Sequence, residues 1–391
     1  MNSFSGLLSS RLNRVRLLLS AAIICFLACM SFFIYTSFIV QKEGGITGVS
    51  GNLLSLPHLH EWRASHSATL LPDGKVLIVA GFRKGPDTYS QLYSATAELY
   101  DPVGRNFTYT GKLHMARCGQ TATLLKGGKE VLITGGNNDR PRLATAELYD
   151  VRTGEWAQLP DMLAGREGHQ AILLKSGKVL IMGGTDDPAV SVELFNPDTR
   201  TFEKAGPLPY DLSSTTAIQL TDGRILFAGG MENRQLVNAA MIYDPGTNQF
   251  APAGNMSTVR YKSGAALLPD GKAMIIGGSD KRDWNGKYSS TEIFDPVSQS
   301  WTRGPELKFE RFKLTHAVIT LKNGDIVVAG GDKHIERYHP ASSRFSVVAT
   351  LDQPYYYSTA TLLPRGDILM TGGYGNDAQP TGKAWLLATE Q

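Results

Sequence analysis

Repeated charges are the first feature of this sequence that could do chemistry. Five similar segments each carry a cation and, later in the same segment, an acid. The cations are Arg63, Arg117, Arg166, Arg260 and Lys313, and the acids are Glu98, Glu147, Glu193, Glu292 and Glu336. A ring of cations would suit an anionic ligand. Two further segments lack both charges. One has Leu212 in place of the cation and Met241 in place of the acid, and the other has Tyr355 and Trp385 in these places. Charges that are present or absent together are typical of ion pairs, because an unpaired buried charge is costly, so we predict structural ion pairs within the segments.

Aromatic side chains beside basic ones are the second candidate chemistry. Two connections, Phe82–Ser94 and Ser279–Ser290, exceed the usual length of about 2–6 residues, and long connections often carry function. Two other segments present tyrosines where the rest carry a cation. The candidate ligand-binding residues are therefore Arg83, Tyr89, Tyr93, Tyr210, Arg282, Trp284, Tyr288, Tyr355, Tyr356 and Tyr357. Such residues suit an acidic glycan or an acidic peptide; packing against a neighbouring segment and a solvated insertion are the alternatives.

The elements that must position these residues form a sevenfold repeat. Each unit has an apolar run, a turn with glycine such as Leu71–Gly74, and a second, almost wholly apolar run such as Val76–Val79. This pattern predicts a hairpin whose second strand is covered on both faces. Each second run ends in a small residue and a glycine, and those glycines are Gly81, Gly136, Gly184, Gly230, Gly278, Gly331 and Gly373. Their spacing is close to the kelch period of roughly 50 residues.

A third and a fourth strand complete each unit. The third contains a motif such as Ala97–Pro102, and the fourth carries an aromatic residue such as Phe107. Four strands make one blade of a β-propeller. The seventh unit has room for only one strand after its glycine pair, near Ala384–Ala388, so we expect Leu53–Leu56 to supply the missing outer strand and close the ring. The predicted fold is an all-β, seven-bladed propeller over residues 53–391.

The span from Leu53 to Thr389 resembles the kelch-repeat propellers, especially the central domain of galactose oxidase, whose blades are similar to the Ala-Thr-Leu-Leu-Pro-Asp-Gly-Lys-Val-Leu-Ile of Ala68–Ile78. That resemblance implies a copper site with a Tyr-His dipeptide and a cysteine-linked tyrosine. Here the dipeptide is Tyr357-Ser358, and Cys118 has Glu167-Gly168-His169 where the tyrosine is expected. We therefore predict no copper-radical chemistry, no cofactor and no catalytic residue.

Three histidines could still bring imidazoles together. His66, His169 and His316 share one strand register in separate units, and three imidazoles suit a metal ion. The competing interpretation is hydrogen bonding between units, which we prefer, so no metal site is predicted.

The N-terminal segment predicts a membrane anchor. Leu17–Val40 is an uninterrupted uncharged run that is long enough to cross a bilayer as a helix. Arg11, Arg14 and Arg16 precede it, so the positive-inside rule places residues 1–16 in the cytoplasm, 17–40 in the membrane, and both a linker, 41–52, and the propeller outside. A cleaved signal peptide is the alternative.

Composition narrows the partners. The formal net charge is +3 and three arginines precede the apolar run, so no concentrated basic face remains for a nucleic acid. Of three cysteines only Cys118 follows that run, so packing must stabilise the fold without a disulfide. We predict a monomeric, non-catalytic module that binds a glycan or protein outside the membrane. The alternative is a carbohydrate-active enzyme, similar to galactose oxidase or to the kelch-type sialic-acid epimerases.

Overall fold

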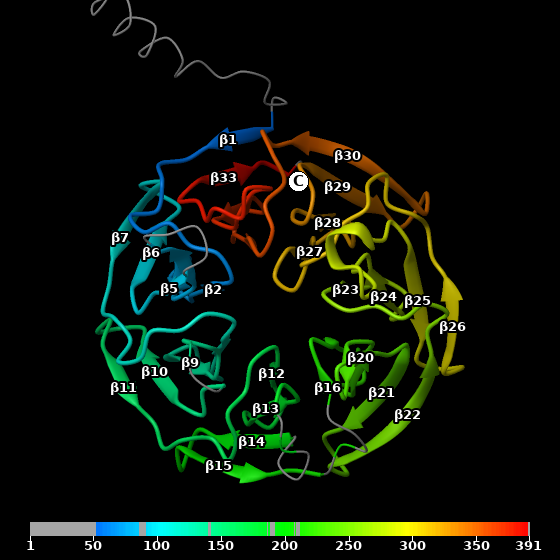
Figure 1. Cartoon of the computed structure of the whole chain (residues 1–391), viewed down its shortest axis with the longest axis horizontal. Coiled ribbons are helices and arrows are strands. Elements are labelled where there is room, and N and C mark those ends of the chain that lie inside the picture. Colours follow the sequence, from blue (N-terminus) through cyan, green and yellow to red (C-terminus); the bar gives the residue numbers. More distant parts are fainter. Residues whose placement is uncertain are drawn as a thin grey trace, which may run out of the picture. The chain divides into compact units, whose positions relative to one another are not determined.

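Seven four-stranded antiparallel sheets are arranged in a ring in the computed structural model (Figure 1). The structure describes residues 52–85, 91–139, 142–185, 187, 192–206, 208 and 212–389. The innermost strands of neighbouring sheets contact one another around a closed circle. The predicted all-β architecture and the predicted number of blades are confirmed.

Blades 1 to 4 follow the chain from the inside of the ring outward. Blade 1 contains β2 (Ser67–Leu70), β3 (Val76–Val79), β6 (Ala97–Asp101) and β7 (Asn106–Tyr109). Blade 2 contains β8 (Thr121–Leu124), β9 (Glu130–Thr134), β10 (Ala146–Asp150) and β11 (Trp156–Gln158). Blade 3 contains β12 (Gln170–Leu173), β13 (Val179–Met182), β14 (Val192–Asn196) and β15 (Thr201–Lys204). Blade 4 contains β17 (Thr216–Gln219), β18 (Ile225–Ala228), β21 (Ala239–Asp244) and β22 (Gln249–Asn255).

Blades 5 to 7 complete the ring. Blade 5 contains β23 (Gly264–Leu267), β24 (Ala273–Ile276), β25 (Thr291–Asp295) and β26 (Ser300–Arg303). Blade 6 contains β27 (Val318–Thr320), β28 (Ile326–Val328), β29 (His334–His339) and β30 (Arg344–Thr350). Blade 7 contains β31 (Thr359–Leu362), β32 (Ile368–Thr371), β33 (Ala384–Leu387) and, as its outer strand, β1 (Leu53–Ser55).

The N-terminal strand closes the ring as the sequence predicts. Leu53 is paired with Leu387 and Ser55 with Trp385 in antiparallel register. Blade 7 therefore combines one strand from the start of the propeller with three from its end, so its outermost strand is supplied by a distant part of the chain.

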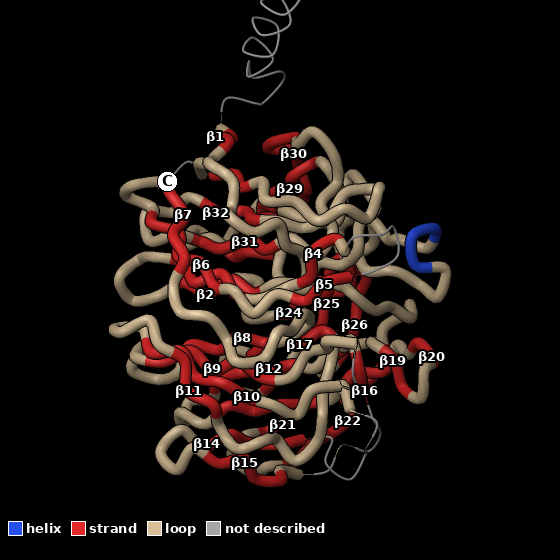
Figure 2. The backbone as a smooth tube through the Cα atoms, turned by 60° about the vertical axis from the view of Figure 1, so that its left-hand side comes forward, coloured by secondary structure: helices blue, strands red, loops and turns tan. Residues whose placement is uncertain are grey.

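Short additional elements follow the glycine pairs. β4 (Phe82–Lys84) pairs with β5 (Gln91–Tyr93), and β19 (Met231–Glu232) pairs with both β16 (Leu212–Ser213) and β20 (Gln235–Leu236). One 3-10 turn, η2 (Asp283–Asn285), lies in the connection from β24 to β25. Figure 2 shows β19, β20 and η2 projecting from the same side of the ring.

The core lies between the blades. Second strands such as β3 and β13 are buried along their whole length, because a neighbouring blade covers each of their faces. In six blades an aromatic residue of the third strand packs on the aromatic residue of the fourth, with ring centroids 4.8–5.1 Å apart. This contact explains why the sequence repeats an aromatic residue in each outer strand.

The glycine pairs are required by the close approach of neighbouring loops. Gly136 has a φ of +101°, and a Cβ on it would lie 2.6 Å from the carbonyl oxygen of Cys118. A side chain there would combine backbone strain with a steric clash.

The predicted membrane segment, Leu17–Val40, lies outside the described residues. Within the ranges that the structure describes, no helix is both long and apolar enough to cross a bilayer.

Candidate functional site

In every blade one residue with a left-handed backbone precedes the innermost strand, and it lies two positions beyond Arg63, Arg117, Arg166, Leu212, Arg260, Arg311 or Tyr355. The left-handed residues are Ser65, Gly119, Gly168, Ser214, Lys262, Lys313 and Tyr357. Their φ values run from +51° at Tyr357 to +65° at Gly119. Residues other than glycine adopt this conformation at a cost of about 1–3 kcal/mol, and such strained positions cluster at functional sites. Three consecutive blades, 5 to 7, place large side chains there.

The left-handed residues line a cavity of about 330 Å³ to which all seven blades contribute. Serine, threonine and glutamine side chains make up much of its wall, and Met231 is the one apolar side chain among the described lining residues. Small-molecule sites start at about this volume. A wall of hydroxyl and amide groups favours a ligand that is itself rich in hydrogen-bonding groups.

Two lysines of this cavity share one carboxylate. The Lys262 Nζ lies 2.9 Å from the Asp283 Oδ1, and the Lys313 Nζ lies 3.8 Å from the Asp283 Oδ2. The Tyr261 hydroxyl donates to the same Oδ1 at 2.8 Å. Asp283 belongs to η2 and has a φ of +53°. The long connection Ser279–Ser290 thus places an acid against cations from two blades.

Aromatic rings surround the amine of Lys313. Its Nζ lies 4.3 Å from the Trp284 ring centroid, and four more rings have centroids within 5.7 Å. These four rings belong to Phe312, Tyr356, Tyr357 and Tyr374. Lys313 also donates to the Tyr374 hydroxyl at 2.7 Å, and its side chain is 5 % exposed. Ring faces attract a cation, so this cage stabilises the protonated amine.

The ionisable groups of the site differ in how burial affects them. Burial lowers the pKa of Lys313 to about 8, although Asp283 opposes this change. Burial would raise the pKa of Asp283, but hydrogen bonds from Lys262 and Tyr261 lower it overall. Burial also raises the pKa of the Tyr357 hydroxyl far above its ordinary value. At neutral pH Lys313 is therefore mostly protonated, Asp283 is ionised and the Tyr357 hydroxyl is neutral.

Buried ion pairs occupy a second register, two residues before the left-handed one. Arg63 Nη2 lies 2.7 Å from Glu98, Arg117 Nη2 2.8 Å from Glu147, and Arg260 Nη2 2.9 Å from Glu292. Arg166 pairs with Glu193 in the same way. The glutamates also accept backbone N–H groups from the segment that enters the blade, as Glu98 does from His60 at 2.8 Å. The pairs thus fasten each incoming segment to its blade, which is a structural role.

Lys313 is not the partner of Glu336, and that prediction was wrong. Arg311 makes this ion pair instead. In blade 6 an extra turn, in which the Ala317 N–H donates to the Leu314 carbonyl, precedes β27. This turn lengthens the segment between the arginine and the glycine pair. As a result Lys313, and not Arg311, lies as far before Gly331 as the arginines of blades 1, 3 and 5 lie before their second glycines. Lys313 instead occupies the left-handed position and faces the cavity.

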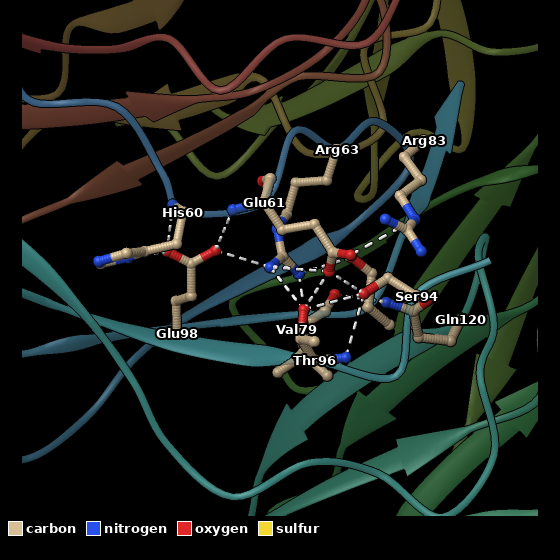
Figure 3. A network of polar contacts seen from close by, with 10 residues as sticks. His60, Glu61, Arg63, Val79, Arg83, Ser94, Thr96, Glu98 and Gln120 are labelled. Carbon is tan, nitrogen blue, oxygen red and sulfur yellow. Dashed lines mark hydrogen bonds and ion pairs between the residues drawn. The ribbon is translucent and has the colours of Figure 1, made fainter. Parts of the chain in front are cut away.

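Arg83 takes part in the polar network around the ion pair of blade 1 (Figure 3). Its Nε lies 3.4 Å from the Glu61 Oε1, while the Ser94 and Thr96 hydroxyls donate to the Glu61 Oε2. Burial raises the pKa of Glu61, but these hydrogen bonds and the nearby arginines lower it overall. Arg83 therefore anchors the β4–β5 hairpin and is not among the residues that line the cavity.

The other predicted ligand-binding residues divide into several groups. Tyr357 lines the cavity and Trp284 covers Lys313. Tyr93 donates to Asp139, Arg282 pairs with Asp280, and Tyr288 lies under Arg260. Tyr355 and Tyr356 are each 1 % exposed, so the expectation that they are exposed was wrong, because both pack against neighbouring elements. Tyr89 and Tyr210 lie outside the described residues.

Two of the three histidines, His66 and His169, bond between blades. His66 Nε2 contacts the hydroxyls of Thr359 and Thr371 of blade 7. His169 Nε2 contacts two threonines of blade 2 in the same way, and burial lowers its pKa to about 3. His316 lines the cavity. In the part of the chain that the structure describes, no three His, Cys, Asp or Glu side chains are placed to hold a metal ion.

The sequence analysis missed Lys262, Asp283 and Tyr374. The first could have been found by counting two residues beyond each arginine, since Arg260 and Arg311 then both lead to lysine. Asp283 reaches the site from a connection that has no constant length between units, so the repeat contains no signal for it, whereas Tyr374 directly follows the glycine pair of its unit, at a position where the other units have different residue types.

Comparison with known proteins identifies the repeat. Residues 122–163 and 261–308 match the family model of the Kelch motif. No curated protein sequence matches the chain. Among solved structures, the chain is similar to a novel fungal alcohol oxidase with catalytic diversity among the AA5 family, in complex with copper. The TM-score is 0.69 at 18 % identity, over 88 % of this chain and 76 % of the oxidase chain. The chain therefore contains Kelch motifs and is a β-propeller similar in fold to this AA5 oxidase.

The residues of the cavity do not suit the copper found in that oxidase. The dipeptide at the left-handed position of blade 7 is Tyr357-Ser358, and blades 5 and 6 contribute Lys262 and Lys313 to the cavity lining. Ammonium groups repel a metal cation and offer it no lone pair. We therefore derive no reaction through copper.

Proposed function

We propose that this protein is a recognition module that binds a glycan or protein ligand in the cavity at blades 5 to 7. The observation that supports this most strongly is the left-handed register, in which Lys262, Lys313 and Tyr357 follow one another around the ring. Three strained positions with functional side chains converge on one polar cavity, which is the pattern of a binding site.

The same residues favour binding over catalysis. The carboxylate that contacts both lysines belongs to Asp283, whose pKa is lowered and whose Oδ1 already accepts two hydrogen bonds. A carboxylate in this state is a weak general base, whereas catalytic acids and bases are tuned toward neutral pH. The site is therefore better suited to hold a charged ligand than to move a proton.

A carbohydrate-active enzyme is the second candidate. The similarity in fold to an AA5 oxidase and the position of Tyr357 at the cavity favour it. A galactose-oxidase-like or epimerase-like reaction would consume or convert a sugar, which a binding module does not do.

We further propose that Leu17–Val40 anchors a monomeric propeller on the extracytoplasmic side of a membrane. The uninterrupted apolar run and the arginines before it support this arrangement. Carbonate washing of membranes and protease treatment of intact cells test it. An anchored propeller stays with the membranes and is cut from outside, whereas release by the wash or protection from the protease contradicts it.

A glycan array and a turnover assay test the binding proposal with the full chain purified in detergent. We expect the wild-type chain to bind to at least one glycan on the array. The double variant Lys262→Ala with Lys313→Ala should no longer bind to that glycan. Lys272→Ala is the control, because Lys272 pairs with Asp270 away from the cavity. Release of an altered sugar from any bound glycan would favour the enzyme, and binding unaffected by the double variant would place the site elsewhere.

A further inference from the structure

We infer that the ligand of the cavity is a sugar with a carboxylate, as in a hexuronate, and that this carboxylate replaces the side chain of Asp283 between Lys262 and Lys313. The inference rests on the proposed binding function and specifies its ligand. The structure itself shows a carboxylate in this position, since Asp283 contacts both lysines and the Tyr261 hydroxyl. Asp283 is thus an internal stand-in for the ligand.

The donors of the site exceed what Asp283 can use. Lys262 donates to Tyr261 and Asp283, which leaves one of its three N–H groups. Lys313 donates to Tyr374, and its distance of 3.8 Å to Asp283 is too long for a hydrogen bond. Two of its N–H groups therefore make no hydrogen bond and face the aromatic rings or Asp283. A carboxylate placed closer to Lys313 would gain charge-assisted hydrogen bonds that Asp283 does not make.

The segment that carries Asp283 is able to release it. Asp283 is one of the positive-φ residues other than glycine, its side chain is 30 % exposed, and none of the residues of η2 is buried. The neighbouring Asp280 pairs with Arg282 and accepts its N–H, so these contacts are independent of the lysines. Moving the Asp283 side chain breaks its contacts to Lys262 and Tyr261 but uncovers no apolar core.

The lining of the cavity favours a sugar over an acidic peptide. The wall offers hydroxyl groups, such as those of Ser65, Ser214 and Thr315, which are not buried, and these match the hydroxyl groups of a sugar ring. A cavity of about 330 Å³ has room for a ring or the end of a chain. An extended peptide usually binds along a groove or a free strand edge.

Titration calorimetry with the full chain in detergent tests the inference. The ligands are D-glucuronate, D-galacturonate and D-mannuronate, each compared with its neutral parent hexose. We expect at least one hexuronate to bind about tenfold or more tightly than its parent, because charged hydrogen bonds are the stronger ones. Lys313→Gln should remove most of this preference, and the melting temperature of the variant shows whether it is folded.

Asp283→Asn and Asp280→Asn separate displacement from general electrostatics. Each removes one negative charge from the same connection, but only Asp283 contacts the lysines. We expect Asp283→Asn to raise hexuronate affinity by about threefold to tenfold, since the competing carboxylate is gone, and Asp280→Asn to change it by less than about twofold.

The possible results have distinct meanings. Equal effects of the two variants, or weaker binding by Asp283→Asn, would overturn the displacement. Binding of neutral hexoses without a preference for hexuronates would overturn the inference that the ligand carries a carboxylate, but it would leave the proposed binding function intact. Binding of a glutamate-rich peptide but of no hexuronate would overturn the inference that the ligand is a sugar. If no array ligand of any class binds, the proposed function fails with it.

Discussion

The arginines and the lysines on this face of the propeller lie only two residues apart in the chain but differ in how their donors are used. Arg63 directs all five of its N–H groups to protein oxygens, including those of Ala80, Thr96 and Glu98. Lys313 uses one of its three for a hydrogen bond, to Tyr374. Both side chains are buried and both lie near carboxylates.

This difference separates structural charges from candidate binding charges. A buried cation whose donors are saturated has nothing left for a ligand, however suggestive its position in a ring. A buried cation with unused donors beside a cavity retains the capacity to bind an anion. Counting donors therefore separates Arg63 and Arg117, which use all five N–H groups, from Lys313, whereas Arg260 and Arg311 each have a buried Nε without a hydrogen-bond partner.

The largest expected effect follows from breaking a structural pair. Arg166→Ala leaves the Glu193 carboxylate buried without its cation, and removing one partner of such a pair typically costs about 3–5 kcal/mol. Chemical denaturation should show this loss in the free energy of unfolding. Arg200→Ala is the control, because the exposed pair of Arg200 with Glu130 is worth about 1 kcal/mol or less. Unchanged stability of Arg166→Ala with lost ligand binding would assign the arginine register to the ligand.

The next effect is on ligand affinity and depends on pH. Burial lowers the pKa of Lys313 to about 8, so its ammonium charge, and with it the affinity for a hexuronate, is lost as the pH rises through about 8. Calorimetry at pH 7 and pH 9.5 should show a fall of about tenfold. The charged or titratable groups that face Lys313 are Lys262, Asp283, Tyr356, Tyr357 and Tyr374.

Lys313→Arg provides the control for this pH dependence. A guanidinium stays protonated over the whole range, so a folded arginine variant that still binds should show little change between the two pH values. An equal fall in the variant would mean that another group controls the affinity.

A smaller loss of affinity is expected from Trp284→Ala. The indole covers Lys313 at 4.3 Å and packs on Tyr356 at 4.4 Å, so its removal weakens the aromatic cage that stabilises the ammonium group. Cation–π contacts contribute about 0.5–2 kcal/mol, which predicts a fall of about threefold to tenfold in calorimetry. Trp62→Ala removes another exposed indole and should leave affinity unchanged. A similar loss in both variants would indicate a general effect of removing tryptophan.

The sequence predicts the scaffold better than the site, and the reason is physical. A repeated β-strand must cover both faces and close its ring, so the pairing of Leu53–Leu56 with the strand near Ala384–Ala388 follows from the pattern, whereas its register, Leu53 with Leu387, comes from the structure. The arginine pairs follow likewise, because the charges appear and disappear together. The site depends on single deviations from the repeat. The extra turn before β27 shifted Lys313 by two positions, and Asp283 enters from a connection of unconstrained length.

The smallest expected effect is the change in the free energy of unfolding when Lys313 is replaced. This change distinguishes Lys313 from the paired arginines. Lys313→Met keeps the methylene groups against the aromatic rings but removes a buried charge that is incompletely paired, so the free energy of unfolding at pH 7 should stay within about 1 kcal/mol of wild type. The pKa of Lys313 is about 8 in the folded protein and near its ordinary value of 10.5 in the unfolded chain. Between these pH values the unfolded chain binds more protons, so wild-type stability should gain from this group as the pH rises. The methionine variant should lack that gain in denaturation curves at pH 7 and pH 9.5. A loss as large as that of Arg166→Ala would instead make Lys313 a structural charge like the arginines.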